Sequence, residues 1–483
     1  MKEFLTVNYC YPPTVHIFNG ALKAILGNAR WVDSLCLVFF STILSFSTCA
    51  TALLLLKNRA AAALTVCFIN IYPCVALLSH IKLLDFPHLS LFTLAMFTLL
   101  NWQRQPTWSR AILCGIALGA ACTTKQIASF FLFAPCLLAL LQQLYARRYD
   151  RALQLTAAGA IVVAFLAVWV VPNWHEISGY MHRNSGHLGS RTVSTAFFPN
   201  LLGYANCAPG LTGYPLLALC LLCLTQARVR QLRSLALPAS ASLAGIICMS
   251  ALPFQLPEHR YIAPVLLFPA LLCAGQICRF YLEKKQILFA VASFLAVYGA
   301  VQFAVLNFSP YPLELPRPLR HALLNTNSDR RGPLEPGFNP TAAGDLWGQQ
   351  WVVRQCKTAA ANQVCWLNML PSTPELSVHT LCLVSRYEGS NVQPTTSRLW
   401  TPLGDKIEFD ASSCKNFHFY LLKTGKQGLQ FESNASAQNY ARIERFVAQG
   451  PDYQLLSSKT IQDGSQLSLY IRKDFASAGG APK

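Results

Sequence analysis

Long apolar runs, separated by short polar or basic segments, occupy the chain from about residue 33 to residue 307. A helix needs roughly 20 residues to cross the hydrocarbon core of a bilayer, and most of the runs approach that length. The pattern predicts a polytopic α-helical membrane protein with about ten spans. The runs are 33–56, 60–79, 86–101, 110–124, 127–146, 152–171, 214–227, 235–252, 261–281 and 286–307.

The segment before the first run has a different pattern. Residues 14–26 place apolar side chains at helical spacing on one side and polar ones on the other. This predicts a short amphipathic helix that lies along the membrane surface.

The chain after residue 307 reads as a linker and a soluble domain. Residues 308–342 are rich in proline, and 343–483 mix helical and strand patterns. We predict a small α/β domain with helices at 343–361 and 436–449 and strands at 364–370, 378–385, 417–423, 453–461 and 466–472. The predicted organisation is therefore an outer amphipathic segment (1–30), a transmembrane domain (31–307), a linker (308–342) and a soluble domain (343–483).

The distribution of charge sets the predicted sidedness. Thirteen Lys and Arg residues lie in one set of loops between the apolar runs, and five lie in the alternate set. Cytoplasmic loops carry the excess of Lys and Arg, so the first set is predicted to be cytoplasmic. The long segment 173–213 and everything after residue 307 then face the opposite side.

The net charge of +18 belongs mostly to the hydrophobic part, because only 7 of the 21 acidic residues lie in the first 307 positions. Basic loops of this kind face anionic lipids, and we expect membrane lipids rather than nucleic acid as partners. Most of the 18 cysteines fall in apolar runs, where Cys is a small packing residue. If the outer side is oxidising, Cys356 and Cys365, or Cys382 and Cys414, could pair.

Ionisable residues gather at the predicted outer ends of the apolar runs. Asp85 begins a run and Lys125 lies at a tight outer turn. Asp85 could simply stabilise the start of a helix, and Lys125 could extend to the interface or bind a phosphate. Ion-coupled transporters place acids near the middle of the membrane, so this distribution argues against a transporter.

Two further outer segments carry candidate residues. Segment 173–213 contains His175, Glu176, Arg183 and Arg191 with interspersed glycines, which favours a flexible lid or acceptor-binding loop; a metal site formed by three of its histidines is the alternative. Residues 257–261 (PEHRY) place His259 and Arg260 at the start of a run, where Arg260 could pair with lipid headgroups or with a phosphate diester.

Taken in order, these features resemble the GT-C membrane glycosyltransferases, and especially the bacterial relatives of dolichyl-phosphate-mannose–protein mannosyltransferases and of aminoarabinose lipid A transferases. The resemblance rests on four short motifs in family order and on their predicted sidedness. They are YPP at 11–13, LLDFP at 83–87, GIALGAACTTK at 115–125 and RYIAP at 260–264.

The resemblance implies transfer of a hexose or pentose from a polyprenyl-phosphate donor to a protein, lipid or glycan acceptor, on the outer face of a bacterial inner membrane rather than an endoplasmic reticulum. It implies that Asp85 assists at the catalytic site or holds a metal, while Lys125, His259 and Arg260 face the donor phosphate. A divalent metal ion is left open.

One departure concerns the family's catalytic acid, which precedes the Pro-Pro pair. Glu3 is the one acid before Tyr11, so we expect either an upstream segment with one more helix or a degenerate member. The missing acid makes a non-catalytic assembly factor on the same scaffold an alternative. A polyprenyl-linked glycan polymerase or ligase is a further alternative, in which a substantial soluble C-terminal domain would be unexpected.

Overall fold

The fold was analysed in a computed structural model. The structure describes residues 12–27, 30–79, 84–187, 193–252, 259–281, 285–308, 345, 347–361, 363–371, 373, 376–395, 414–425, 434–461 and 464–478. The chain divides into two compact units, one that holds the apolar helices and one that holds a C-terminal sheet.

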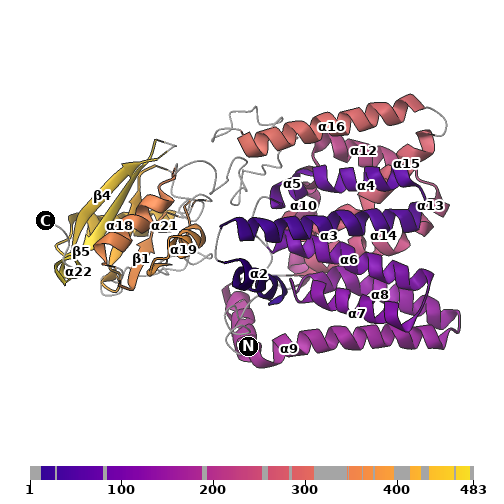
Figure 1. Cartoon of the computed structure of the whole chain (residues 1–483), viewed down its shortest axis with the longest axis horizontal. Helices are drawn as coiled ribbons and strands as arrows, with labels where there is room; N and C mark the ends of the chain where they lie inside the picture. The colour runs from indigo at the N-terminus through magenta and orange to yellow at the C-terminus, as the bar shows by residue number, and fades with distance from the viewer. Residues whose placement is uncertain are drawn as a thin grey trace. The chain divides into compact units, whose positions relative to one another are not determined.

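The helical unit follows the predicted apolar runs closely (Figure 1). Its elements are α2 (Thr14–Leu26), α3 (Arg30–Leu56), α4 (Arg59–Ile71), α5 (Pro73–Leu78), α6 (Asp85–Arg104), α7 (Trp108–Cys122), α8 (Ala128–Tyr145), α9 (Tyr149–His187), α10 (Val193–Asn206), α11 (Ala208–Thr212), α12 (Tyr214–Thr225), α13 (Val229–Ser234), α14 (Ala236–Ala251), the 3₁₀ helix η1 (His259–Leu266), α15 (Leu267–Tyr281) and α16 (Lys285–Phe308).

Local sequence signals explain several of these boundaries. The side chains of Asn58 and Thr107 accept hydrogen bonds from backbone N–H groups at the starts of α4 and α7, which satisfies donors that have no partner within the helix. The run 60–79 is broken between α4 and α5 at Pro73, because proline has no N–H to continue the ladder.

Four helical stretches are long and apolar enough to cross a membrane: Trp31–Leu56, Ala128–Tyr145, Tyr149–His175 and Arg260–Arg279. A fifth arises if the pair Thr195–Thr212 and Tyr214–Thr225, bent by 110°, is taken as one span. The protein is thus an integral membrane protein with several apolar spans. Each of the ten predicted runs contains a helix, but the number ten stays a prediction.

Polar contacts fix the helices against one another inside the unit. Ser47 on α3 and Thr93 on α6 share a hydrogen bond of 2.8 Å. The indole N–H of Trp102 on α6 donates to Gln154 on α9 at 3.0 Å. All four side chains are buried. Such bonds join helices where apolar surface alone gives little preference, because lipid tails are equally apolar.

The C-terminal unit is a mixed sheet with helices. Its strand order is β2-β1-β3-β5-β4, in which β1 pairs in parallel with β2 and β3, and β5 pairs antiparallel with β3 and β4. The elements are α18 (Gln349–Ala359), β1 (Cys365–Met369), α19 (Val378–Tyr387), β2 (Val392–Thr395), β3 (Phe419–Lys423), α21 (Asn434–Gln449), β4 (Tyr453–Thr460), β5 (Gln466–Arg472) and α22 (Lys473–Ala478).

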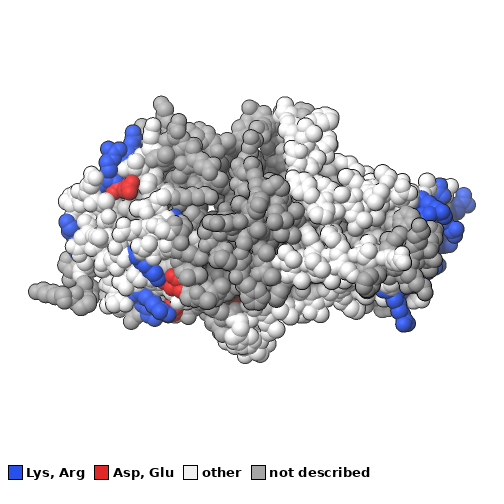
Figure 2. Space-filling view, turned by 90° about the horizontal axis from the view of Figure 1, so that it is seen from above, with Lys and Arg blue, Asp and Glu red and all other residues white. Residues whose placement is uncertain are grey.

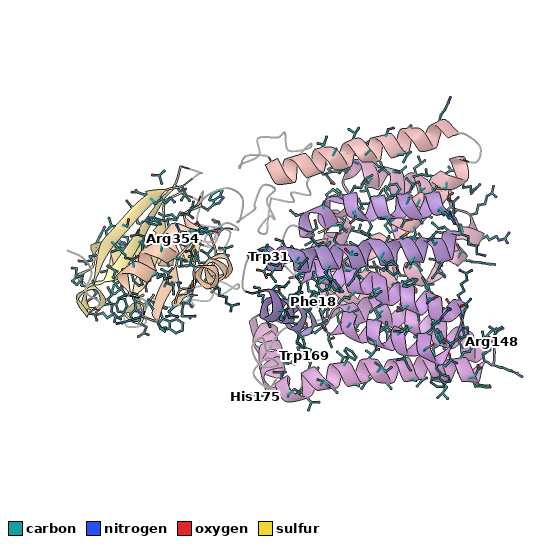
Figure 3. The ribbon with its side chains drawn as sticks, in the orientation of Figure 1. Phe18, Trp31, Arg148, Trp169, His175 and Arg354 are labelled. Carbon is teal, nitrogen blue, oxygen red and sulfur yellow. The ribbon has the colours of Figure 1, made fainter. Side chains whose placement is uncertain are left out.

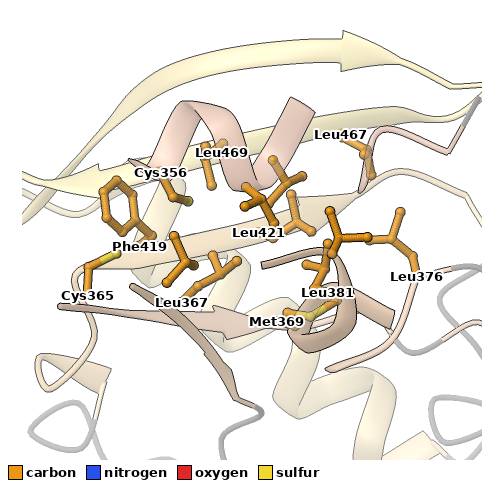
Figure 4. Packing of buried hydrophobic residues seen from close by; sticks show 14 of the residues in the cluster. Cys356, Cys365, Leu367, Met369, Leu376, Leu381, Phe419, Leu421, Leu467 and Leu469 are labelled. Atoms are coloured by element: carbon orange, nitrogen blue, oxygen red, sulfur yellow. The ribbon is translucent and has the colours of Figure 1, made fainter. Parts of the chain in front are cut away.

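Alternate residues of the sheet enter two separate cores. Leu367, Phe419 and Leu469 belong to the core shown in Figure 4, which α18 and α19 also line. Tyr420 and Leu422, which alternate with Phe419 and Leu421 on β3, lie in the other core with α21. This alternation is what a sheet covered on both faces requires.

Two predictions for this unit, a strand at 378–385 and the disulfides, differ from the structure. Residues 378–385 form helix α19 rather than a strand, because Ser377 and Thr380 form a capping box and Leu381, Val384 and Ser385 then fall on one buried face. Neither of the two proposed disulfides is formed, because all four of the cysteines concerned are free. Burial raises the pKa of the Cys356 thiol well above its ordinary value, and the nearby Cys365 adds to this.

Candidate active site

Asp85 and Lys125 are in direct contact, although 40 residues separate them. Asp85 is the first residue of α6, and Lys125 lies in the turn between α7 and α8. Only 4% of Asp85 and 8% of Lys125 is exposed. A buried charge is costly without a partner, so this ion pair is what allows both residues to lie inside the helical unit.

Arg260 and Lys125 both contact the ring of Tyr261. The Lys125 ammonium lies 4.3 Å from the centroid of the Tyr261 ring, and the Arg260 guanidinium carbon lies 4.9 Å from it. Arg260 also donates a hydrogen bond of 3.1 Å to the Tyr261 hydroxyl. One aromatic ring therefore contacts two cations, one from η1 and one from the α7–α8 turn, as cation–π attraction allows.

No role was predicted for Tyr261 from the sequence. The feature that could have identified it is its position as an aromatic residue directly after Arg260, at the start of an apolar run. Only the fold shows that this ring also receives Lys125.

Helix α2 docks on the turn that carries Lys125. The Thr14 N–H donates to the Thr123 carbonyl at 3.1 Å, and the two threonine hydroxyls share a hydrogen bond of 2.7 Å. At its other end, Lys23 forms an ion pair of 2.9 Å with Asp33 on α3. The predicted amphipathic helix is thus confirmed at residues 14–26 and is tied to the candidate site; its place on a membrane surface stays a prediction.

Close packing of α7 on α9 explains the glycine-rich motif before Lys125. A Cβ atom placed on Gly115 would lie 2.8 Å from the Ala158 carbonyl oxygen, and one on Gly119 would lie 2.8 Å from the Phe165 ring. The two glycines therefore permit a close approach that a larger residue would prevent. This contact positions the end of α7, and with it the turn that carries Lys125.

The other predicted site residues do not join this cluster in the described part of the chain. His259 begins η1, but its side chain is outside the described residues. His175 lies exposed on α9. Glu176 and Arg183 belong to the same helix without a described side chain, and Arg191 lies outside the described residues.

The loop predicted for 173–213 is corrected, because α9 extends to His187 and the segment then contains α10 and α11. Its role as a lid or acceptor-binding segment stays a prediction. Helix α9 runs through Gly179 and Gly186 to His187, since each glycine costs a helix only about 1 kcal/mol. The helix also argues against the three-histidine metal site. His175 and His182 are seven residues apart, roughly 10 Å along a helix axis, which is too far for one ion. Among the described residues, no group of three His, Cys, Asp or Glu side chains could hold a metal.

His88 is a polar residue that the sequence analysis did not select. It lies on α6 one turn after Asp85 and is completely buried. Its ring meets Phe131 edge to face at 6.2 Å.

Figure 3 places the labelled residues at two ends of the helical unit: Phe18, Trp31 and His175 at one, and Arg148 at the other. Helix α2, which carries Phe18, contacts the turn of Lys125, so the candidate site lies at the end away from Arg148.

Comparison with known proteins agrees with this architecture. Residues 28–184 match the sequence profile of the family described as dolichyl-phosphate-mannose-protein mannosyltransferase. The chain also resembles the crystal structure of ArnT from Cupriavidus metallidurans bound to undecaprenyl phosphate. The identity is 15% and the TM-score 0.56, over 97% of this chain and 89% of that one. The chain therefore has the same fold as this ArnT.

The apo structure of the same ArnT gives 14% identity and a TM-score of 0.56, over 98% of this chain and 92% of that one. A comparison with curated protein sequences gives no match. The family resemblance inferred from the four short motifs is therefore confirmed by the profile and by the fold.

Proposed function

We propose that this protein is a glycosyltransferase that moves a sugar from a polyprenyl-phosphate donor to an acceptor on the non-cytoplasmic face of the membrane. The observation that carries the proposal is the cluster of Asp85, Lys125, Tyr261 and Arg260 at one end of the helical unit. The similarity to an ArnT structure that contains undecaprenyl phosphate supports this class of donor.

The chemistry of the cluster suits departure of a phosphate. When the bond between the sugar and the phosphate breaks, negative charge develops on the leaving oxygen, and fixed cations stabilise it most strongly where water is excluded. Lys125 is buried and Arg260 is half-buried, so both lie where their charges are poorly screened. Both cations are therefore assigned to the donor phosphate.

Asp85 cannot act on substrate while its carboxylate is held by Lys125. A donor phosphate offers Lys125 a competing anion. Opening of the Asp85–Lys125 pair would release the Asp85 carboxylate beside the reacting atoms. The carboxylate can then take a proton from the acceptor group or orient that group. In this proposal donor binding and activation of Asp85 are one event.

The proposed sidedness rests on the cations at the other end of the helical unit. Lys and Arg side chains gather at the end that bears Arg148 (Figures 2 and 3). Among the described residues of these loops, the exposed cations are Lys57, Arg59, Arg104, Arg147, Arg148, Arg228, Arg230 and Arg233. By the positive-inside rule that end is cytoplasmic, which leaves the Asp85 cluster on the outer side.

The test is donor turnover by purified protein in detergent. Labelled polyprenyl-phosphate sugars are supplied, and release of free polyprenyl phosphate is measured for wild type, Asp85→Asn and Arg260→Ala. We expect release by wild type and a loss of at least about 100-fold in each variant, the size found when one charge-stabilising group is removed. Arg148→Ala removes an exposed cation at the far end and should keep wild-type release.

Full release in both site variants would refute the assignment of the site. No release by wild type from any donor would refute the enzyme and favour a non-catalytic assembly factor.

A further inference from the structure

The burial of His88 is unusual for its chemistry. No part of the side chain is exposed. Among the residues that the structure describes, neither ring nitrogen has a hydrogen-bond partner. A buried donor or acceptor without a hydrogen bond lowers the stability of the folded protein. A hydrogen bond that His88 forms in another state of the protein would therefore explain its burial.

The position of His88 points to Asp85 as the missing partner. The two residues are three positions apart on α6, and side chains at this spacing are neighbours on a helix surface. His88 also interacts electrostatically with both Lys125 and Asp85.

Aromatic side chains pack beside His88. Phe131 meets the His88 ring at 6.2 Å and the Phe92 ring at 6.1 Å. Gly245 on α14 has no side chain, and a Cβ there would collide with the Phe131 ring. The Phe131 ring offers His88 no conventional hydrogen-bond acceptor, whereas the Asp85 carboxylate, three positions earlier on α6, is one.

Lys125 has a second contact besides Asp85. Its ammonium already lies over the face of Tyr261, and Arg260 lies against the same ring. An anion bound at these cations would draw Lys125 away from Asp85. The Asp85 carboxylate, of which 4% is exposed, would then be buried without its counter-ion.

We propose that His88 is a positioning residue whose ring N–H donates to the Asp85 carboxylate when Lys125 moves to a bound phosphate. This rests on the proposed function, because it takes the donor phosphate as the anion. His88 stabilises the released carboxylate and fixes its direction. In the absence of donor, Lys125 occupies Asp85 and His88 stays without a hydrogen bond.

The experiment measures the affinity of full-length protein in detergent for undecaprenyl phosphate by native mass spectrometry. His88→Phe keeps a ring of similar size but has no N–H. We expect it to weaken binding by about 10-fold or more, the effect of one hydrogen bond to a charged group. His88→Gln keeps an N–H donor and should bind more tightly than His88→Phe.

A double-mutant cycle separates this role from packing. In the Asp85→Asn background no carboxylate is released, so His88→Phe should change the affinity by less than about 2-fold. The control Phe92→Leu alters packing on the same Phe131 ring and should leave affinity near wild type. Without ligand, His88→Phe should unfold at the same temperature as wild type or at a higher one, since it removes two unsatisfied buried nitrogens.

Three results would overturn the inference while leaving the proposed function intact. They are an unchanged affinity of His88→Phe, an equal loss in both Asp85 backgrounds, and an equal loss in Phe92→Leu or His88→Gln. If wild type itself binds no undecaprenyl phosphate, the donor assignment fails and the inference fails with it.

Discussion

A buried ion pair between Asp85 and Lys125 is the central feature of this protein at the scale of single residues. Such pairs add little to stability compared with apolar residues, because both charges lose their hydration. Retaining one at the end of a helical unit is therefore better explained by chemistry than by folding. The same pair makes Lys125 and Asp85 depend on each other energetically.

Lys125→Met should destabilise the protein by about 3–5 kcal/mol, because it leaves the Asp85 carboxylate buried and unpaired. The double variant Lys125→Met with Asp85→Asn should recover a large part of that loss, since no unpaired charge remains. Thermal unfolding in detergent measures both effects. Equal unfolding temperatures for the single and double variants would contradict this prediction.

His418 gives the C-terminal unit a predicted pH dependence. Burial, and secondarily Arg472, hold the pKa of His418 below its ordinary value of 6.5, and its Nδ1 accepts the Trp366 N–H at 3.1 Å. The folded protein thus binds a proton less readily than the unfolded chain, so stability is lost as pH falls through 6.5 towards the lowered pKa.

Thermal unfolding of the full-length protein at about pH 7.5 and about pH 5 measures this dependence. His418→Gln keeps an acceptor that does not titrate, and we expect it to show a smaller drop between the two pH values. An identical drop in wild type and His418→Gln would assign the pH dependence to other groups.

At the scale of elements, the contact between α7 and α9 determines where Lys125 lies. Gly115 and Gly119 let α7 approach α9 closely, and the chain reaches Lys125 shortly after α7 ends. Helix α2 then docks on that same turn through Thr14 and Thr123. The site is therefore assembled from helix ends whose positions depend on packing some distance away.

Gly115→Ala should lower both stability and donor turnover. The added methyl group meets the Ala158 backbone carbonyl, and overpacking of this kind costs about 1–3 kcal/mol. Gly159→Ala on α9 is the matched control, because nothing lies within 4 Å of its Cβ position. We expect a lower unfolding temperature and slower release of polyprenyl phosphate for Gly115→Ala only. Wild-type behaviour of Gly115→Ala would show that the two helices can separate without moving Lys125.

At the scale of the whole molecule, the uneven placement of charge predicts which side of the membrane each end of the helical unit faces. Among the described residues of the helical unit, the exposed cations lie in the loops around Arg148, and the candidate site lies at the other end. The proposed polyprenyl-phosphate donor would have to present its headgroup on the side of the candidate site, so the proposed function requires this orientation.

Fusions test this orientation in a bacterial host. Alkaline phosphatase fused after Lys483 should be active and green fluorescent protein there should be dark, because we expect the C-terminus outside the cytoplasm. Fusions after Arg148 should give the opposite pattern by the positive-inside rule. A fluorescent C-terminal fusion would reverse the proposed orientation.

The sequence by itself determined the membrane helices, the amphipathic segment at 14–26 and most strands of the C-terminal unit. These follow from hydrophobic periodicity, which acts between residues a few positions apart. It also placed Asp85, Lys125 and Arg260 at ends of apolar runs that are predicted to face outward. The motifs gave the family resemblance that the profile and the fold confirm. Strand β2 (Val392–Thr395) and the helical state of α19 were missed, because short segments carry weak periodic signals.

Only the tertiary structure decided which of these residues meet. The contact of Asp85 with Lys125 crosses 40 positions, and the Tyr261 ring reaches both cations from a third segment. His88 looked like an ordinary helix residue until packing of α6 against α8 showed it buried without a partner in the described part of the chain. Local patterns fix helices, but the free energy of a buried charge or an unmade hydrogen bond depends on neighbours that are distant in the sequence.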